Sequence, residues 1–189
     1  GFEKCTCLQS LDISLNKVTE IKGLVNFSNL INLDLSVNQI SEIKGLEKCT
    51  ILENLNLADN EISELKGLNR LQHLQTLNLN HNLIYNLKNL SKLGRIQKID
   101  LSENPIINLK ELPQLIKNPN LITLRLFGVQ QNDLKIPVEL FGQSANDNCL
   151  EPLRGYFASL KKGSFQFNEV PIILVGNSTA GKTSLRYFL

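Results

Sequence analysis

Apolar residues recur along most of the chain with a period of 22 positions, and each period contains one asparagine. The asparagines are Asn16, Asn38, Asn60, Asn82 and Asn104. The same seven positions around each asparagine are apolar. Around Asn38 they are Leu30, Leu33, Leu35, Ile40, Ile43, Leu46 and Cys49. A repeat that keeps its register in this way indicates equivalent structural units stacked on one another.

Each unit contains the form L-x-x-L-x-L, and its L-x-L end alternates with the period of two that is typical of a strand. One coil cannot bury its apolar side chains alone but a stack can, and each fully buried leucine contributes roughly 1.5–3 kcal/mol. We expect each asparagine to turn the chain and to bond backbone groups of its own coil and of the next. Gly23, Gly45, Gly67 and Asn89 share one phase, and these residue types tolerate positive φ, so a tight turn is expected there.

The period and the form L-x-x-L-x-L-x-x-N-x-I-x-x-I resemble the leucine-rich repeat family, in its short intracellular class typified by a regulatory subunit of protein phosphatase 1. The resemblance covers about residues 1–128 and implies a horseshoe solenoid with a concave parallel sheet and short 3₁₀ or helical segments behind it. GFEKCTC at 1–7 matches GLEKCTI at 45–51, so we expect the chain to begin in mid-coil. Near the other end Val129 replaces the asparagine, as expected of a last coil.

Residues 129–167 lose the repeat and are expected to cap the solenoid and connect it to the segment after residue 167. A helix is predicted over about 148–162, with Leu150, Leu153, Phe157 and Leu160 on one apolar face. Residues 168–189 contain VPIILVG, which we expect to form a buried strand that leads into a phosphate loop.

The loop fits the pattern G-x-x-x-x-G-K-[ST]. Its backbone N–H groups would surround nucleotide phosphates at the start of a new helix. Lys182 would reach the β- and γ-phosphates, and Thr183 would ligate Mg²⁺. The candidate nucleotide-binding residues are Gly176, Asn177, Ser178, Thr179, Ala180, Gly181, Lys182, Thr183 and Ser184.

Solenoid, connector and phosphate loop succeed one another in the order of Roco proteins, which the chain resembles over nearly its whole length. The resemblance implies an α/β fold in which a Ras-like GTPase domain, truncated here after its first strand, loop and helix start, comes after the repeats. It also implies GTP or GDP with Mg²⁺ as ligands, and a homodimer formed through a domain beyond residue 189. The switch threonine, Asp-x-x-Gly and Asn-Lys-x-Asp of such a domain would lie past Leu189. We therefore expect GTPase activity of the full-length parent alone, and assign no catalytic residue.

Two other hypotheses stay open. One makes the chain a pure leucine-rich-repeat interaction module of the phosphatase-regulator type, with a non-functional phosphate loop. The other makes the nucleotide ATP, because nothing before Leu189 reads the base.

A protein partner would bind the concave face, where two outward columns of strand residues are expected. One column is Asp12, Asp34, Asn56, Asn78, Asp100 and Arg125, and the other is Ser10, Asn32, Asn54, Thr76, Lys98 and Thr123. Aromatic anchors, which are frequent at binding hot spots, are missing from this face before Phe127. The alternative that the face is merely solvated therefore also stays open.

Composition narrows the class of partner. A hydrophobic content of 42% and a charged content of 20% are typical of a soluble globular chain, and the net charge of +2 gives no reason to expect nucleic acid. No apolar run approaches the roughly 20 residues that span a bilayer.

The cysteines indicate neither a disulfide nor a zinc site, because Cys5 and Cys49 share a core phase and Cys7 and Cys149 lack zinc-site spacing. Free thiols favour a reducing, cytoplasmic setting. By phase, His73 and His81 are expected at exposed turns.

Overall fold

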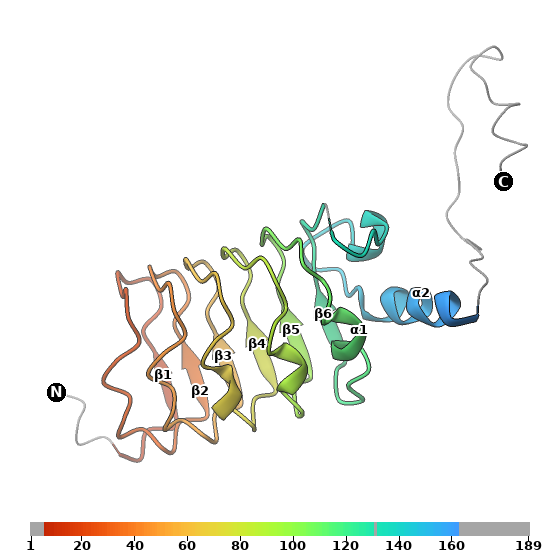
Figure 1. Cartoon of the computed structure of the whole chain (residues 1–189). Coiled ribbons are helices and arrows are strands. Elements are labelled where there is room, and N and C mark those ends of the chain that lie inside the picture. The colour runs from red at the N-terminus through yellow and green to blue at the C-terminus, as the bar shows by residue number, and fades with distance from the viewer. Residues whose placement is uncertain (1–5, 131, 163–189) are drawn as a thin grey trace, which may run out of the picture.

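The computed structural model describes residues 6–130 and 132–162, and these form a stack of coils that places one strand per turn in a shared sheet (Figure 1). The sheet has six strands in sequence order, and each strand is parallel to its neighbour. They are β1 (Ser10–Asp12), β2 (Asn32–Asp34), β3 (Asn54–Asn56), β4 (Thr76–Asn78), β5 (Lys98–Asp100) and β6 (Thr123–Arg125). The coils are numbered below from the one that contains Asn16 to the fifth, which contains Asn104.

The register of the sheet reflects the repeat. Leu33 pairs with Leu55 and Leu55 with Leu77, each 22 residues further on, whereas Ile99 pairs with Leu124 across the longer last repeat. The central residue of every strand from β2 to β6 is buried in the continuous leucine and isoleucine core. The predicted solenoid with a parallel sheet is therefore confirmed.

Short helical segments lie on the opposite side of the core from the sheet and are drawn in front of the strands in Figure 1. They are η2 (Leu68–Arg70), η3 (Leu90–Lys92) and α1 (Leu112–Leu115). The expected tight turns precede η2 and η3: Gly67 has φ +92° and Asn89 has φ +78°. Each segment contributes a leucine that is fully buried, so the back of the solenoid closes the core.

The asparagines of coils two to five hold adjacent coils together. The Asn82 amide nitrogen donates to Leu79 and Asn80 oxygens of its own coil and to the Leu57 oxygen of the preceding coil. Its amide oxygen accepts the N–H of Ile62, also in the preceding coil, at 3.0 Å. The expectation that the side chain reaches the next coil is wrong. The turn instead places the asparagine side chain against the preceding coil, where it bonds backbone groups.

Residues after the last strand cover the end of the stack. The Asn148 side chain accepts the N–H of Leu124 at 3.0 Å and donates to Ile122 at 3.0 Å, and the Cys149 N–H donates to the Leu124 oxygen at 2.9 Å. These bonds occupy the outer edge of β6. The segment Val138–Phe141 (η4) lies before this cap in the chain, and its Phe141 is buried in the core.

A helix, α2 (Leu150–Lys162), stands where the sequence predicts one over about 148–162. Leu150 and Leu153 are buried, and Phe157 is partly buried. Leu160, expected on the same apolar face, is exposed, because the helix runs past the end of the stack (Figure 1). The Arg154 guanidinium ties the helix to the last repeat by donating to the Ile116 oxygen at 2.9 Å and the Asn118 oxygen at 3.0 Å.

Candidate interaction surface

The predicted nucleotide site lies outside the described residues. This applies to all of 176–184, including Lys182 and Thr183, and to the strand expected before the loop. GTP, GDP and Mg²⁺ therefore remain predicted ligands of that segment.

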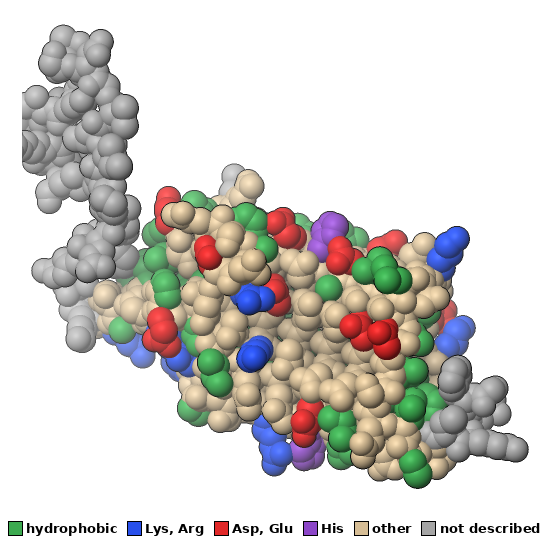
Figure 2. Space-filling view, turned by 180° about the vertical axis from the view of Figure 1, so that it is seen from behind, with side chains coloured by type: hydrophobic (Ala, Val, Ile, Leu, Met, Phe, Trp, Pro, Cys, Tyr) green, Lys and Arg blue, Asp and Glu red, His purple; other side chains and the backbone are tan. Residues whose placement is uncertain are grey.

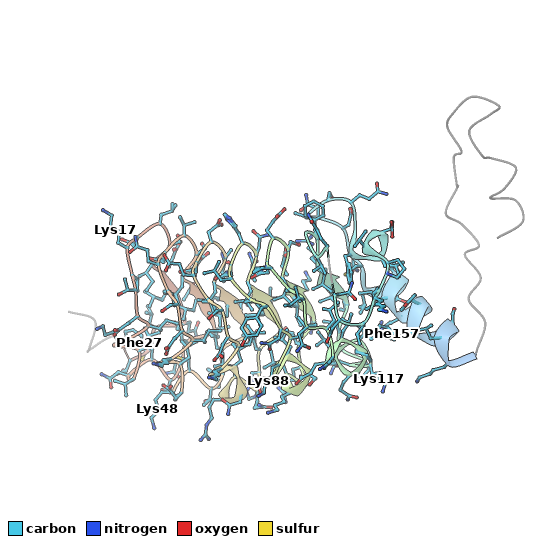
Figure 3. The ribbon with its side chains drawn as sticks, turned by 45° about the horizontal axis from the view of Figure 1, so that its top comes forward. Lys17, Phe27, Lys48, Lys88, Lys117 and Phe157 are labelled. Atoms are coloured by element: carbon cyan, nitrogen blue, oxygen red, sulfur yellow. The ribbon has the colours of Figure 1, made fainter. Side chains whose placement is uncertain are left out.

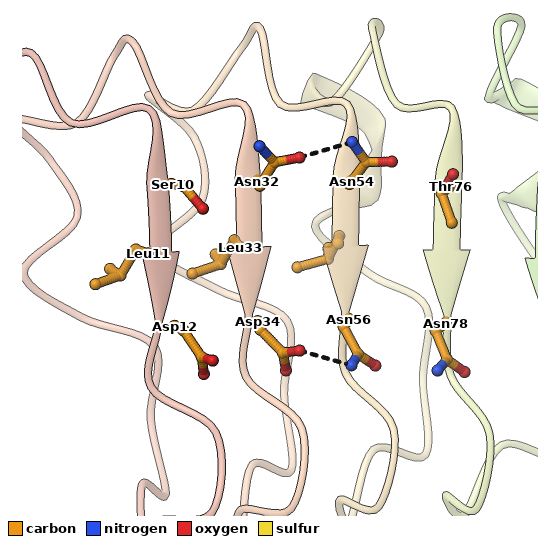
Figure 4. A pocket seen from close by; sticks show the side chains of 11 residues that line it. Ser10, Leu11, Asp12, Asn32, Leu33, Asp34, Asn54, Asn56, Thr76 and Asn78 are labelled. Carbon is orange, nitrogen blue, oxygen red and sulfur yellow. Dashed lines mark hydrogen bonds between the residues drawn. The ribbon is translucent and has the colours of Figure 1, made fainter.

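Within the described part, the concave face of the sheet is the candidate site. The strands direct their central leucine or isoleucine into the core and their two flanking residues to the outside, so both predicted columns lie on this face. Figure 4 shows the columns over the first four strands, where they line a shallow hollow of about 390 Å³. A second hollow of about 230 Å³ continues it over β4, β5 and β6.

From β1 to β5, the first column is fixed by bonds to the turn that comes after each strand. One carboxylate oxygen of Asp34 accepts both the N–H and the hydroxyl of Ser36, at 2.9 and 2.6 Å. Asp12 accepts the same pair of bonds from Ser14, and these bonds hold the pKa of Asp12 below its ordinary value. Asn56 and other members of the column accept the corresponding N–H alone. These side chains therefore hold the turn as well as forming the surface.

Bonds between neighbouring strands also link successive members of each column. Asn54 donates to Asn32 at 2.7 Å and Asn56 donates to the second Asp34 oxygen at 2.9 Å, as Figure 4 shows. Short side chains tethered in this way lose little conformational entropy when a partner binds. The face is therefore a pre-organised polar surface.

The two halves of the concave face differ in charge. Asp12 and Asp34 are the charged residues of the first hollow, which contains no basic side chain. Lys98 and Arg125 lie in the second hollow, where Arg125 contacts Asp100 at 3.1 Å. Figure 2 shows the corresponding separation, with red side chains toward the N-terminal half of this face and blue ones toward the C-terminal half. No ion pair of Lys98 is found among the described residues, and its ammonium is exposed.

Arg125 carries a feature that the sequence does not signal. Its Nη1 bonds the Asp100 carboxylate, while its Nε is buried and finds no hydrogen-bond partner in the part of the chain that the structure describes. The guanidinium is thus only partly satisfied, and Arg125 is one of the residues that line the second hollow. The repeat phase predicts Arg125 on the face but cannot predict this partial pairing.

The histidines and cysteines add no further site. His81 is exposed and contacts Asp59 of the preceding coil at 2.5 Å, and His73 contacts the Thr50 oxygen. Cys7, Cys49 and Cys149 are free thiols. In the described ranges no group of three or more His, Cys, Asp or Glu is placed to hold a metal ion, and no helix is long and apolar enough to cross a bilayer.

Comparison with known proteins shows similarity in the solenoid. No protein-family model and no curated protein matches the chain. Among solved structures, an internalin (inlF) from Listeria monocytogenes is 27% identical with a TM-score of 0.57, over 71% of this chain and 38% of that one. Internalin C2 (inlC2) of the same organism is 27% identical with a TM-score of 0.56, over 66% of this chain and 54% of that one.

A third similar structure is the functional domain of InlJ from Listeria monocytogenes, described as including a cysteine ladder. It is 28% identical with a TM-score of 0.56, over 67% of this chain and 26% of that one. The matched part is thus about half or less of each of these proteins. In this chain, Cys49 is followed at the same position of the next two coils by leucines, Leu71 and Leu93, and not by further cysteines. The comparisons support a leucine-rich-repeat solenoid similar to that of internalins, and they give no support to a Roco-type nucleotide domain.

Proposed function

We propose that this chain is a protein-interaction module that binds a partner protein across the concave face of its sheet. The observation that supports this most is the surface itself: two tethered polar columns whose charge changes from acidic over β1 and β2 to basic over β5 and β6. The similarity to internalins, which are also leucine-rich-repeat proteins, agrees with a scaffold of this kind. It also favours the repeat-only hypothesis over a Roco-type switch.

The charge arrangement indicates how a partner would be oriented. A segment with basic side chains over Asp12 and Asp34, and acidic side chains over Lys98 and Arg125, would meet opposite charges at both ends. Complementary charges of this kind accelerate association and fix the register of the complex. The middle of the face, with its small amides and threonine, would accept hydrogen bonds without a steric barrier.

A photo-crosslinking residue placed at Asn78 on the concave face, with Arg70 on η2 as the matched position on the back, tests the proposal. Proteins captured from the source cell at Asn78 and not at Arg70 would be purified and their binding measured. We expect Asp34→Lys and Lys98→Glu each to weaken binding about tenfold or more, with Arg70→Glu neutral. Equal capture at the two positions, or binding unaffected by both concave variants, would refute the proposal.

A second candidate function rests on the sequence pattern of residues 176–184. In a longer parent protein, this loop would bind the phosphates of GTP or GDP, with Lys182 on the β- and γ-phosphates and Thr183 on Mg²⁺. Such a parent would dimerise through a domain beyond residue 189, and the free thiols fit a cytoplasmic location.

Nucleotide binding is tested with a chain extended past Leu189 through the whole nucleotide domain. Fluorescent GDP is titrated in Mg²⁺, with ADP as competitor and Lys182→Ala as control. Binding that GDP displaces, ADP does not, and Lys182→Ala weakens would establish a guanine-nucleotide switch. Displacement by ADP instead would favour the ATP hypothesis, and a folded protein that binds neither would leave the repeats as the functional part.

A further inference from the structure

Two outward columns of residues on the edge of the coils change character between the third coil and the fourth. These positions lie one and three residues after each repeat asparagine. In the first three coils they are polar: Lys17, Gln39 and Glu61 in one column, Thr19, Ser41 and Ser63 in the other. In coils four and five they are apolar: Leu83 and Pro105 in the first column, Tyr85 and Ile107 in the second. Because all five coils share one fold, the change from polar to apolar residues alters the exposed surface and not the backbone.

These four apolar residues form one exposed array. Leu83, Tyr85 and Ile107 are 53%, 43% and 57% exposed, whereas Ile84, which lies between the first two in the chain, is fully buried. Neighbouring coils are joined at this point, because Tyr85 O accepts the N–H of Ile107 at 3.2 Å. At a strand-like spacing of roughly 4.8 Å between coils, the side chains lie in adjacent rows. We refer to Leu83, Tyr85, Pro105 and Ile107 as the apolar array.

A charged column beside the apolar array changes at the same coils. In coils one to three, a glutamate four residues after the asparagine pairs with a lysine two residues further on. The pairs are Glu20 with Lys22, Glu42 with Lys44, and Glu64 with Lys66. In coils four and five the lysines remain as Lys88 and Lys110, but the glutamates are replaced by Asn86 and Asn108.

Both asparagines keep the turn without supplying charge. Asn86 accepts the Lys88 N–H at 2.9 Å, and Asn108 accepts the Lys110 N–H at 3.2 Å. Within the described ranges, neither lysine belongs to an ion pair, and both are exposed. Lys88, labelled in Figure 3, therefore lacks the glutamate partner within its own coil that its counterparts in coils one to three have.

Glu64 shows that the apolar array and the unpaired lysines are close to one another. Its carboxylate contacts Lys66 at 2.5 Å, and the Tyr85 side chain and the Lys88 charge also act on it. All three interactions lower the pKa of Glu64, with Lys66 contributing most. A residue of the apolar array and one of the unpaired lysines thus act on the same carboxylate.

We propose that coils four and five carry a docking surface, formed by the apolar array with Lys88 and Lys110, for a segment of a partner protein that combines apolar and acidic side chains. The apolar array supplies contact area that gains by leaving water. The two lysines supply the complementary charge, which is absent from the corresponding places on coils one to three. This surface lies on the edge and back of the coils, so it is separate from the concave face and does not depend on the function proposed for that face.

A lipid surface is the less favoured occupant. The two lysines would contribute only about 1 kcal/mol each to the free energy of binding an anionic membrane. Asp59, Glu61 and Glu64, whose charges such a membrane would repel, lie on the coil next to them. A protein segment can place single acidic groups over Lys88 and Lys110, whereas an anionic membrane would face all of these carboxylates at once.

The test uses the 189-residue chain and short random peptides displayed on phage. Peptides that are enriched on the chain would be synthesised, and their affinity measured by fluorescence polarisation. We expect the enriched peptides to contain both acidic and large apolar residues. Two variants that restore the pattern of the other coils should each weaken their binding at least about tenfold. They are the pair Asn86→Glu with Asn108→Glu, and the triple variant Leu83→Gln, Tyr85→Ser and Ile107→Ser.

These substitutions copy residues that occupy the same positions in coils two and three, so the fold should tolerate them, and circular dichroism would verify this. The pair Glu20→Asn with Glu42→Asn, which unpairs lysines on coils without an apolar array, should change nothing. Lys98→Glu on the concave face should also have no effect. A loss of binding only with Lys98→Glu would assign the peptides to the concave face and overturn this inference.

Other outcomes would also overturn it. One is enrichment of peptides without acidic residues, or binding that both coil-pattern variants leave intact. Another is binding to phosphatidylserine vesicles that the triple variant abolishes, which would make lipid the occupant. A further one is self-association in sedimentation experiments that the same variant abolishes, which would make a second copy of the chain the occupant.

Discussion

The amide oxygen of Asn60 accepts the backbone N–H of Ile40 at 2.9 Å, across the boundary between two coils. The amide nitrogen of the same residue donates to the Leu35 oxygen of the preceding coil at 3.0 Å, and to the Leu57 and Ala58 oxygens of its own coil. One buried side chain therefore satisfies four backbone groups on two coils. The solenoid is held together by such polar links as well as by its apolar core.

Replacing Asn60 with aspartate should destabilise the protein strongly. The carboxylate keeps an acceptor for the Ile40 N–H but has no donor for the three carbonyl oxygens, and its charge would be buried among them. We expect the free energy of unfolding in urea to fall by about 3 kcal/mol or more. Asn16→Asp is the matched control, because Asn16 is exposed and its side chain donates to Ile13 and Ser14 of its own coil. Equal losses in the two variants would contradict this explanation.

Gly67 and Gly23 occupy the same phase and differ in their surroundings. A Cβ atom at Gly67 would lie 1.9 Å from the Ile43 backbone oxygen, whereas one at Gly23 would have nothing within 4 Å. Both residues have positive φ, so an alanine at either position adds about 1–2 kcal/mol of backbone strain. We expect Gly67→Ala to cost about 2 kcal/mol more than Gly23→Ala, because the backbone must also move. Thermal or urea unfolding of the two variants measures the difference, and equal costs would show that the clash relaxes freely.

The repeat phase explains why this much could be predicted from the sequence. It identifies which leucines face the core, where the turns at Gly23, Gly45, Gly67 and Asn89 lie, and which strand residues form the concave face. It could not predict that the asparagines reach back to the preceding coil, since either direction fits a 22-residue period. The Asn148 cap of β6 has no periodic signal at all, because a side chain there takes the place of a strand backbone.

Val37 has φ +54°, which is unusual for a β-branched residue. The same position holds Asp59 in coil three, with φ +53°. Asparagine and aspartate tolerate this region, so Val37→Asn should raise the free energy of unfolding by about 1 kcal/mol. Val25→Asn is the control, because Val25 is also exposed but is not among the residues with positive φ. Stabilisation by both variants would indicate a general effect of polarity instead.

The strain at Val37 also shows why local residue preference does not identify every turn. A position that needs positive φ is normally recognised by glycine or asparagine, but the column contains Leu15, Val37, Asp59, His81 and Glu103. The geometry is imposed by the backbone bonds between coils, such as that from the Val37 N–H to the Ala58 oxygen at 2.9 Å. Local preference is overruled here by the stack.

Cys149 should make stability depend on pH in the alkaline range. Burial raises the pKa of its thiol to about 12, against about 8.5 in an unfolded chain. The folded state thus keeps the proton to higher pH than the unfolded state. The stability that the protonated Cys149 thiol contributes is therefore fully present below about pH 8.5. It is lost between there and about pH 12, by at most about 1.4 kcal/mol per pH unit.

Unfolding in urea at a series of pH values would measure this loss. Cys149→Ala should be less stable at neutral pH, because it leaves a cavity, but its stability should fall less steeply above about pH 8.5. Cys7→Ala is the control, because Cys7 is exposed and its removal should leave the slope unchanged. Parallel curves for the wild type and Cys149→Ala would show that other groups, such as lysines and tyrosines, cause the whole alkaline loss.

The cap on β6 has a consequence for how molecules of this protein can associate. An open sheet edge can recruit the strand of another molecule and so start the growth of a filament. Here the Leu124 N–H and oxygen and the Ile122 oxygen are already bonded by Asn148 and Cys149. Replacing Asn148 with alanine would free the Leu124 N–H and the Ile122 oxygen for another strand. The Asn148 amide therefore opposes polymerisation at that end of the sheet.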